Sequence, residues 1–381
     1  MNKMRSVTTR KYLFILVGLS LLSSCHVGRF FIYNFADIRD YKKFPKQIIK
    51  KQDQPFLFSA QAPGDSVRLP KHISTKRKSY DFENFLRKSK SVAFLVIRND
   101  SLLYQYYGQG YTGSSIVPSF SMAKSFVSML LGIAIDEGAI KDVHEPITKY
   151  LPELTNAGMD KVTIEDLLNM RSGIRFNEGY LNPFGDVAKY YYGQNLKKYI
   201  RQLGVGSSPD EKFQYKSVNS QLLCMIVERA VHKPLGEYME EKVWRYIGAE
   251  YDASWSVDSK RDNEIKGFCC FNARARDFAK IGRLYLNNGN WNGRQIVSEK
   301  WVKRSTDANN KNGGFYSYQW WHTLDHDAKG TRTISGDFFA DGLLGQFIYV
   351  YPQKNIVIVR LGKKEGVHIW PTLMKEIARA N

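Results

Sequence analysis

Strand-like segments at both ends of this 381-residue chain, with helical segments between them, are the feature that most constrains its fold. Val92–Arg98 and Leu102–Tyr107 are rich in β-branched and aromatic residues and flank Asn99-Asp100, a pattern that predicts a hairpin. Further strand-like runs follow near the C-terminus: Tyr316–His322, Gly345–Val350 and Ile356–Leu361. We therefore expect an α/β protein in which one sheet is assembled from both termini.

The middle of the chain is largely helical. A helix is expected from about Ser121 to Asp136, closed by Gly138. Further helices are expected at 163–173, 195–203, 219–232, 234–246, 273–286 and 371–380. Arg175–Gly193 is too long for a simple connector and is interpreted as a lid or pocket wall.

The N-terminus resembles an export signal. Basic residues precede the apolar run Tyr12–Leu22, whose eleven residues are too few to span a bilayer and suit a signal-peptide core. The run ends in Leu22-Ser23-Ser24-Cys25, which resembles the bacterial lipobox, in which the cysteine is diacylated. We expect membrane attachment through Cys25 and a place in the bacterial cell envelope, periplasm-facing or at the outer membrane. The alternative is a plain signal peptide with an incidental cysteine.

Charge and cysteine content argue against other classes. The net charge of +19 favours anionic neighbours such as phospholipid head groups, or is a solvated lysine-rich surface. The chain has no zinc-ligand spacing, RNA-binding signature or block of five like charges, so neither nucleic acid nor a metal is expected. Cys224, Cys269 and Cys270 form an odd set, which argues against a disulfide framework, and the two neighbouring cysteines are not expected to bond.

One segment carries a nucleophile motif. Pro118–Phe126 contains the only Ser-x-x-Lys of the chain, formed by Ser121 and Lys124. On a helix, residues three apart share a face, so the Lys124 amine can reach the Ser121 hydroxyl. A serine hydroxyl is a poor nucleophile, and an amine in a partly desolvated cleft can accept its proton. The apolar flanks favour a buried helix start over a solvated helix face.

Two further motifs could belong to the same site. Phe213–Ser220 places Tyr215 just before an apolar helix, and a phenol with a lowered pKa can act as general base and then as acid. Ala340–Gln346 contains Gly342, and glycine lets a strand backbone approach a neighbour closely. N–H groups there could complete an oxyanion hole with the N–H of Ser121. Each motif alone could equally be ordinary packing.

The order of these three motifs resembles that of serine β-lactamases and penicillin-binding proteins. The surrounding sequence is similar to the class C β-lactamase-like family, including its esterases, D-peptidases and 6-aminohexanoate-dimer hydrolase. The similar phrases are Thr163–Gly173 (TIEDLLNMRSG), Phe213–Asn219 (FQYKSVN), Arg276–Trp291 (RDFAKIGRLYLNNGNW) and Gly345–Pro352 (GQFIYVYP). The likeness covers roughly residues 85–380.

The resemblance implies a β-lactamase-like α/β fold: an antiparallel sheet with flanking helices, and an inserted all-helical domain. The resemblance places the active site between an α/β domain (81–120 with 267–381) and a helical domain (121–266). The N-terminal sequence itself predicts the two preceding segments, a signal peptide (1–24) and a tether with an extended arm (25–80). The resemblance also implies Ser121 as acylated nucleophile, Lys124 as its activating partner, Tyr215 as proton shuttle, and the backbone of Ser121 and Leu343 as oxyanion hole, without a cofactor. Weaker candidates for substrate contact are Ser217, Gly342, Asp341, Asp186 and Tyr190.

The sequence departs from the family in ways that bear on the substrate. Tyr215-Lys216-Ser217 is closer to the 6-aminohexanoate-dimer hydrolase and esterase branch than to the Tyr-x-Asn of β-lactamases. Lactamases and D-peptidases place a cation and a hydroxyl before the glycine of the third motif, whereas this chain has Ala340 and Asp341. We therefore expect a hydrolase of small esters or amides. The alternatives are a peptidoglycan D-peptidase or weak β-lactamase, and a catalytically silent binding or sensor relative.

Overall fold

The computed structural model describes residues 26–33, 35–60, 66–74, 78–308, 311–326, 329–366 and 369–381. The predicted signal peptide and Cys25 lie outside these residues. Within them, no helix has both the length and the apolar character needed to cross a membrane.

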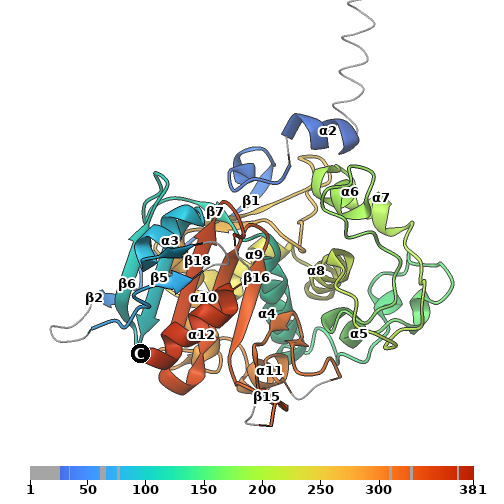
Figure 1. Ribbon diagram of the computed structural model, residues 1–381. Coiled ribbons are helices and arrows are strands. Elements are labelled where there is room, and N and C mark those ends of the chain that lie inside the picture. Colours follow the sequence, from blue (N-terminus) through green and yellow to red (C-terminus); the bar gives the residue numbers. More distant parts are fainter. Residues whose placement is uncertain are drawn as a thin grey trace, which may run out of the picture.

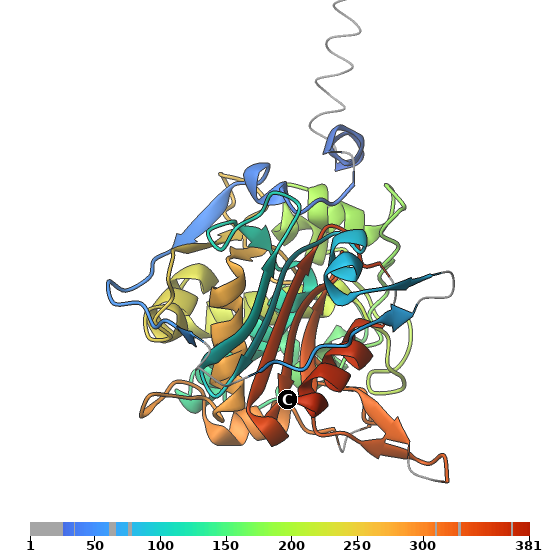
Figure 2. The same cartoon turned by 60° about the vertical axis from the view of Figure 1, so that its left-hand side comes forward.

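An eight-stranded sheet forms the centre of the molecule (Figures 1 and 2). Its strand order is β12-β13-β16-β17-β18-β5-β6-β2, so strands from both ends of the sequence lie side by side. The strands are β2 (Ser59–Ala60), β5 (Ser91–Arg98), β6 (Ser101–Tyr107), β12 (Tyr316–Ser317), β13 (Trp320–Trp321), β16 (Phe338–Gly342), β17 (Gln346–Tyr351) and β18 (Ile356–Gly362). Neighbouring pairs are antiparallel except β2 and β6, which run parallel, so the sheet is mixed rather than purely antiparallel.

The turns of the sheet explain where the sequence prediction holds and where it fails. Asn99 and Asp100 both have positive φ (49° and 62°), which suits a two-residue hairpin turn and confirms the predicted β5–β6 pair. The run Tyr316–His322 was expected to be one strand, which is wrong. Tyr318 and Gln319 have φ of 38° and 72°, and this left-handed pair reverses the chain between β12 and β13.

Both faces of the central sheet are buried. Side chains along β18 alternate between two cores, with Val357 and Val359 on one face and Ile356 and Ile358 on the other. Helix α10 (Ala275–Leu286) covers the first face, and α3 (Phe82–Lys88) and α12 (Trp370–Ala380) cover the second. This two-sided burial explains why these strands read as nearly continuous apolar runs.

Two described parts of the segment expected to be a tether and extended arm, a helix and a strand, pack against the body of the protein. Helix α2 (His26–Tyr33) lies against α6 (Asp186–Tyr192) at one end of the molecule (Figure 1). Strand β1 (Lys46–Ile49) pairs with β8 (Ala253–Ser256), and the Ile49 side chain is fully buried. Apolar residues of this segment, among them Phe30, Phe44 and Ile49, belong to the main core, and their burial holds the segment in place.

A second, four-stranded sheet has the order β1-β8-β9-β7, with β7 at Val117–Pro118 and β9 at Phe271–Ala273. Because β8 and long stretches without regular structure lie within residues 121–266, that region is not the all-helical domain that was expected. Its helices are α4 (Ala123–Asp136), α5 (Ile164–Leu168), α6, α7 (Leu196–Ile200), α8 (Ser217–Val231), α9 (Leu235–Met239) and a π-helix, η5 (Glu240–Trp244).

Short 3-10 turns lie at Asp40–Lys42, Phe120–Met122, Ile147–Lys149, Met159–Lys161 and Pro352–Lys354, and the remaining helix is α11 (Glu299–Ser305). Three small hairpins complete the fold: β3 (Ile73–Ser74) with β4 (Ser79–Tyr80), β10 (Asn290–Trp291) with β11 (Arg294–Gln295), and β14 (Leu324–His326) with β15 (Arg332–Ile334).

The cysteines correct one expectation. Cys269 and Cys270, which were not expected to bond, form a disulfide between adjacent residues. The chain turns sharply there, since Cys270 has φ of 71°. Both residues are buried, and Cys224 is a free, buried core residue, as expected.

Candidate active site

Ser121 lies on a strained turn that presents its hydroxyl. It is the middle residue of the 3-10 helix η2 (Phe120–Met122), directly before α4. Phe120 has φ of 44°, a left-handed value that a bulky residue rarely adopts. Ser119 ties this turn to β9, because its N–H donates to the Phe271 carbonyl (2.7 Å) and its hydroxyl accepts from the Phe271 N–H (3.1 Å). Ser121 is thus held partly exposed between two buried neighbours.

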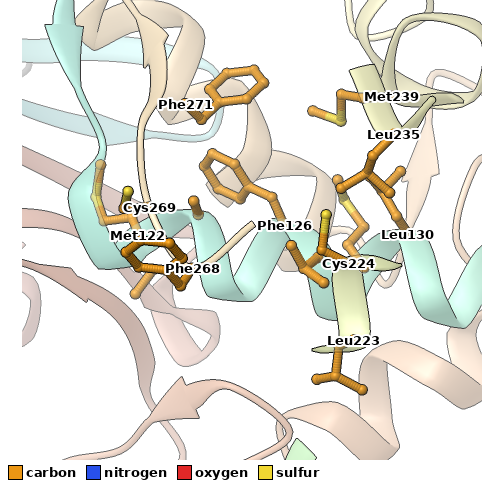
Figure 3. Close-up of a cluster of buried hydrophobic side chains, with 14 of the residues drawn as sticks. Met122, Phe126, Leu130, Leu223, Cys224, Leu235, Met239, Phe268, Cys269 and Phe271 are labelled. Carbon is orange, nitrogen blue, oxygen red and sulfur yellow. The ribbon is translucent and has the colours of Figure 1, made fainter. Parts of the chain in front are cut away.

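The start of α4 is anchored in the main core. Figure 3 shows Met122 and Phe126 among the side chains of Phe268, Phe271 and neighbouring residues. The rings of Phe126 and Phe271 meet edge to face, with their centroids 5.2 Å apart. Such close packing fixes the direction in which the first turn of α4 points.

Lys124 is buried with its amine on the Ser121 hydroxyl. Its Nζ lies 2.9 Å from Ser121 Oγ and 2.7 Å from the carbonyl oxygen of Phe268. Burial lowers the pKa of Lys124 to about 8, although the negative charges of Glu178 and Asp341 partly oppose this. A substantial neutral fraction of this amine near neutral pH can accept the serine proton.

Tyr215 completes the group around the nucleophile. It hydrogen-bonds to Ser121, and Lys124 Nζ lies 5.2 Å from the centre of its ring. Burial raises the pKa of Tyr215 well above its usual value, and the nearby phenols of Tyr180 and Tyr316 raise it further. The pKa of the Tyr215 phenol is therefore not lowered, as a role as general base would require. Tyr215 is a neutral hydroxyl that can donate a proton, while Lys124 is the better acceptor.

Glu178 is a site residue that the sequence analysis missed. Its carboxylate accepts from the backbone N–H of Ser217 (2.7 Å), from the Ser217 hydroxyl and from the Tyr180 phenol (2.8 Å). Its charge also raises the pKa of Lys124 and of Tyr215. Glu178 therefore fixes the loop onto the start of α8 and tunes the catalytic groups. The one signal in the sequence was that Glu178 lies in the loop 175–193, which was interpreted as a lid or pocket wall.

Gly342 brings the end of β16 against the nucleophile turn. A Cβ at this position would lie 2.2 Å from the Ser119 carbonyl oxygen and 3.3 Å from the Ser121 nitrogen, so only glycine fits. Leu343 follows directly, in the turn between β16 and β17. The fully buried Arg360 donates to the carbonyl of Gly345 and fixes this turn. The arrangement brings the backbone of residues 342–343 to the place where an oxyanion hole with Ser121 is expected.

Asp341 acts on the same site. Burial, and after it the charge of Glu365, raise its pKa to about 7. The backbone N–H of Gly342 and the charges of Lys124 and Arg360 oppose that rise. Because Asp341 in turn raises the pKa of Lys124, the acid of the third motif is electrostatically coupled to the catalytic lysine.

An apolar pocket of about 190 Å³ adjoins Ser121. Residues 35–36, 180–181, 268–269 and 343–344 line it, together with Ser217 and one side of α6. The expected loop 175–193 is thus a pocket wall, although it contains the unforeseen helix α6. Asp186 and Tyr190, the other candidates from this loop, do not line the pocket: Asp186 accepts from the Asn177 N–H (2.8 Å), and Tyr190 is buried against Phe176 and Phe268.

Within the described part of the chain, no group of three or more His, Cys, Asp or Glu side chains could hold a metal ion. The chemistry that the arrangement supports directly is nucleophilic attack by Ser121, assisted by a neutral amine and a phenol.

Comparisons with known proteins agree with this geometry. Residues 82–369 match the family model described as Beta-lactamase. The chain is 29% identical over 314 residues to the 6-aminohexanoate-dimer hydrolase of Paenarthrobacter ureafaciens, covering 76% of each chain.

Solved structures show the same fold. A Bacillus anthracis protein provisionally named a 6-aminohexanoate-dimer hydrolase superposes with a TM-score of 0.76 at 23% identity, covering 91% of this chain and 92% of that one. A family VIII carboxylesterase gives a TM-score of 0.61 at 16% identity over 78% and 94% of the two chains. A class C beta-lactamase superposes with a TM-score of 0.60 at 15% identity, covering 78% of this chain and 92% of that one.

Proposed function

Because this chain belongs to the beta-lactamase family, we propose that it is a serine hydrolase that cleaves small, uncharged esters or amides through an acyl-enzyme on Ser121. The observation that carries the proposal is the contact of 2.9 Å between Ser121 Oγ and a buried Lys124 amine whose pKa is lowered to about 8. Proteins similar to it include one named 6-aminohexanoate-dimer hydrolase and a family VIII carboxylesterase, which supports this choice of bonds.

The geometry supports a two-stage reaction. Ser121 Oγ attacks the substrate carbonyl carbon and its proton passes to neutral Lys124. The carbonyl oxygen becomes an oxyanion, which accepts hydrogen bonds from the N–H groups of Ser121 and Leu343. Collapse breaks the bond to the leaving group, which takes a proton from Tyr215, and Lys124 returns a proton to Tyr215. Water then repeats the sequence on the acyl-enzyme and releases the acid and Ser121.

The third motif argues for substrates without a carboxylate beside the scissile bond. Position 340 holds a buried alanine, so no cation stands there, and Asp341 carries negative charge above its pKa of about 7. The loss of a charge-assisted hydrogen bond to a substrate carboxylate is worth about 1.5–3 kcal/mol. This corresponds to about a ten- to hundredfold lower kcat/KM.

The test compares p-nitrophenyl butyrate with nitrocefin and a D-Ala-D-Ala peptide, using the wild type and Ser121→Ala. We expect the ester to have the highest kcat/KM and Ser121→Ala to abolish its turnover. Faster cleavage of nitrocefin or the peptide would replace the proposal by a β-lactamase or D-peptidase. No turnover of any substrate and no acylation of Ser121 would indicate a silent relative.

We also propose export and acylation of Cys25, which rests on the N-terminal sequence alone. Intact-mass analysis of the membrane fraction should show a mature N-terminal Cys25 that carries lipid. A mature chain that begins elsewhere and lacks lipid would contradict this.

A further inference from the structure

Exposed apolar side chains gather around the active-site pocket. Six of the ten large apolar side chains exposed in the described residues lie on two short segments: Phe31, Ile32 and Phe35 on the first, and Tyr180, Leu181 and Phe184 on the second. We call these six residues the apolar rim. Leu181 and Phe184 are 80% and 78% exposed, an unusual state for large apolar groups. Contiguous exposed apolar groups commonly mark a contact with a partner or a lipid surface.

The first segment of the rim is held against α6, the helix that follows the second segment along the chain. Helix α2 packs against α6, and the Arg29 guanidinium donates to the Tyr192 carbonyl. The buried Phe30 ring meets the rings of Phe35 (5.2 Å) and Tyr192 (5.3 Å) edge to face. The first segment of the rim is therefore fixed on the folded protein.

The rim continues into the active-site pocket. Phe35, Tyr180 and Leu181 belong to the rim and also line the pocket beside Ser121. Val187 and Ala188 of α6 and Leu344 provide further apolar wall of the same pocket. An apolar cavity of about 150 Å³ accommodates a ligand the size of benzene, so about 190 Å³ suits a chain of about six carbons.

Positive charge stands beside the rim. Arg39, Lys42 and Lys46 follow Phe35 along the chain and are exposed, and Arg39 forms an ion pair with Asp37 (3.1 Å), which leaves the two lysines as the main positive charge of this segment. Cations next to exposed aromatic groups suit an anionic lipid surface, which attracts the cations while the aromatic groups enter its interface. Helix α2 begins at His26, one residue after the cysteine proposed to carry lipid, so a lipid anchor would hold the rim close to the membrane.

We propose that the substrate is an amphiphile whose hydrocarbon chain passes over the apolar rim into the pocket beside Ser121, with the rim resting on a lipid surface. This inference rests on the proposed serine hydrolase activity and specifies its substrate class: an ester or amide with an apolar chain of about six carbons or more. The bond at Ser121 is cleaved by the reaction described above, and the chain contributes binding alone.

The pocket is tested with p-nitrophenyl acetate, butyrate, hexanoate and octanoate below their aggregation concentrations. Each added methylene should raise kcat/KM about three- to fourfold until the pocket is filled. Ala188→Phe, which fills the pocket, should lower the octanoate-to-acetate ratio of kcat/KM at least about tenfold. Ala36→Phe makes the same test from the opposite segment, and the acetate rate of each variant reports whether its catalytic centre is folded.

A kcat/KM that is flat or falls from acetate to octanoate, with acetate still cleaved, would overturn the chain-binding inference and leave the proposed function standing. Failure to cleave any ester, together with no acylation of Ser121, would instead overturn the proposed function. The two failures are therefore distinguishable.

The rim is tested with p-nitrophenyl palmitate dissolved in equimolar phosphatidylcholine and phosphatidylglycerol vesicles. The double variant Leu181→Ser/Phe184→Ser should hydrolyse this substrate at least about tenfold more slowly relative to its acetate rate. Leu57→Ser is the matched control, because Leu57 is also exposed but lies just before β2, at the far edge of the central sheet from β16. Equal ratios in the rim variant and this control would contradict the role of the rim.

Discussion

The catalytic centre and the pocket beside it are built by opposite means. Around Ser121, the reacting groups are tied to one another and to the core: Lys124 to a carbonyl, Tyr215 to the nucleophile, and Gly342 against the Ser119 carbonyl. The pocket, like the centre, combines segments far apart in the sequence, but its mouth leaves apolar side chains exposed instead of tied to one another. A rigid centre can perform one kind of chemistry, while the wall segments determine which molecule is presented to it.

The largest effect should come from removing the groups that carry protons in the centre. Lys124→Met and Tyr215→Phe should each lower kcat by about 10²–10⁴-fold, because each removes a positioned proton donor or acceptor. Steady-state kinetics with a short ester measures this. Tyr285→Phe is the matched control, since Tyr285 is also buried but packs on Trp320 away from the site. Near-normal turnover in Tyr215→Phe would show that another group protonates the leaving group.

A substitution at Gly342 can separate β16 from the nucleophile turn without changing any ionisable group. In Gly342→Ala, the added methyl would meet the Ser119 carbonyl at 2.2 Å, so strand and nucleophile turn must separate. We expect kcat to fall by roughly 10²–10³-fold, the usual effect of losing one oxyanion donor. In the control Gly113→Ala, the nearest atom is 3.4 Å from the new Cβ, an ordinary contact. Equal activity in both variants would remove Gly342 and Leu343 from the proposed oxyanion hole.

Position 341 tests how the catalytic centre discriminates between substrates with and without a carboxylate. Replacing Ala340 and Asp341 by Lys and Thr should raise kcat/KM for nitrocefin relative to p-nitrophenyl butyrate by about ten- to hundredfold. Asp341→Asn alone should give a smaller gain, seen mainly above pH 7, where the native carboxyl with its pKa of about 7 is ionised. An unchanged ratio at all pH values would show that position 341 does not meet the substrate.

The smallest expected effect is a shift in the pH profile. Because the neutral Lys124 amine accepts the proton, kcat/KM should rise with pH through the lysine pKa of about 8 and then level off. The negative charge of Glu178 raises that pKa, so Glu178→Gln should move the rising limb about half a unit to one unit toward lower pH. The remote control Glu299→Gln, on the exposed face of α11, should leave the limb in place. A shift toward higher pH would contradict the assignment of this limb to Lys124.

Short-range patterns explain why the centre could be predicted. Ser121 and Lys124 are three residues apart on one helix, so their contact follows from helix geometry, and the hairpin followed from Asn99-Asp100. Tyr215 and Gly342 were candidates from their own motifs, and the order of the motifs, which resembles that of a known family, assigned them to one site. The structure shows both residues beside Ser121. The helix start with Ser121 and Lys124 and the hairpin at Asn99-Asp100 were predictable because local sequence determines their conformation.

The features that escaped prediction depend on tertiary contacts. Glu178 reaches Ser217 only because its loop folds back onto α8, and no local pattern distinguishes it from Asp186 in the same loop. The packing of residues 26–49 on the body depends on pairing with a strand some two hundred positions away. The Cys269–Cys270 bond depends on a left-handed turn that a pair of adjacent cysteines does not by itself indicate.

The most direct test of the account is the site of covalent labelling. The protein is treated with a fluorophosphonate, digested, and the adduct mapped by mass spectrometry, with Ser121→Ala in parallel. The account predicts one adduct, on Ser121, that is absent from Ser121→Ala and slowed in Lys124→Met. An adduct on another serine, undiminished in Ser121→Ala, would contradict it.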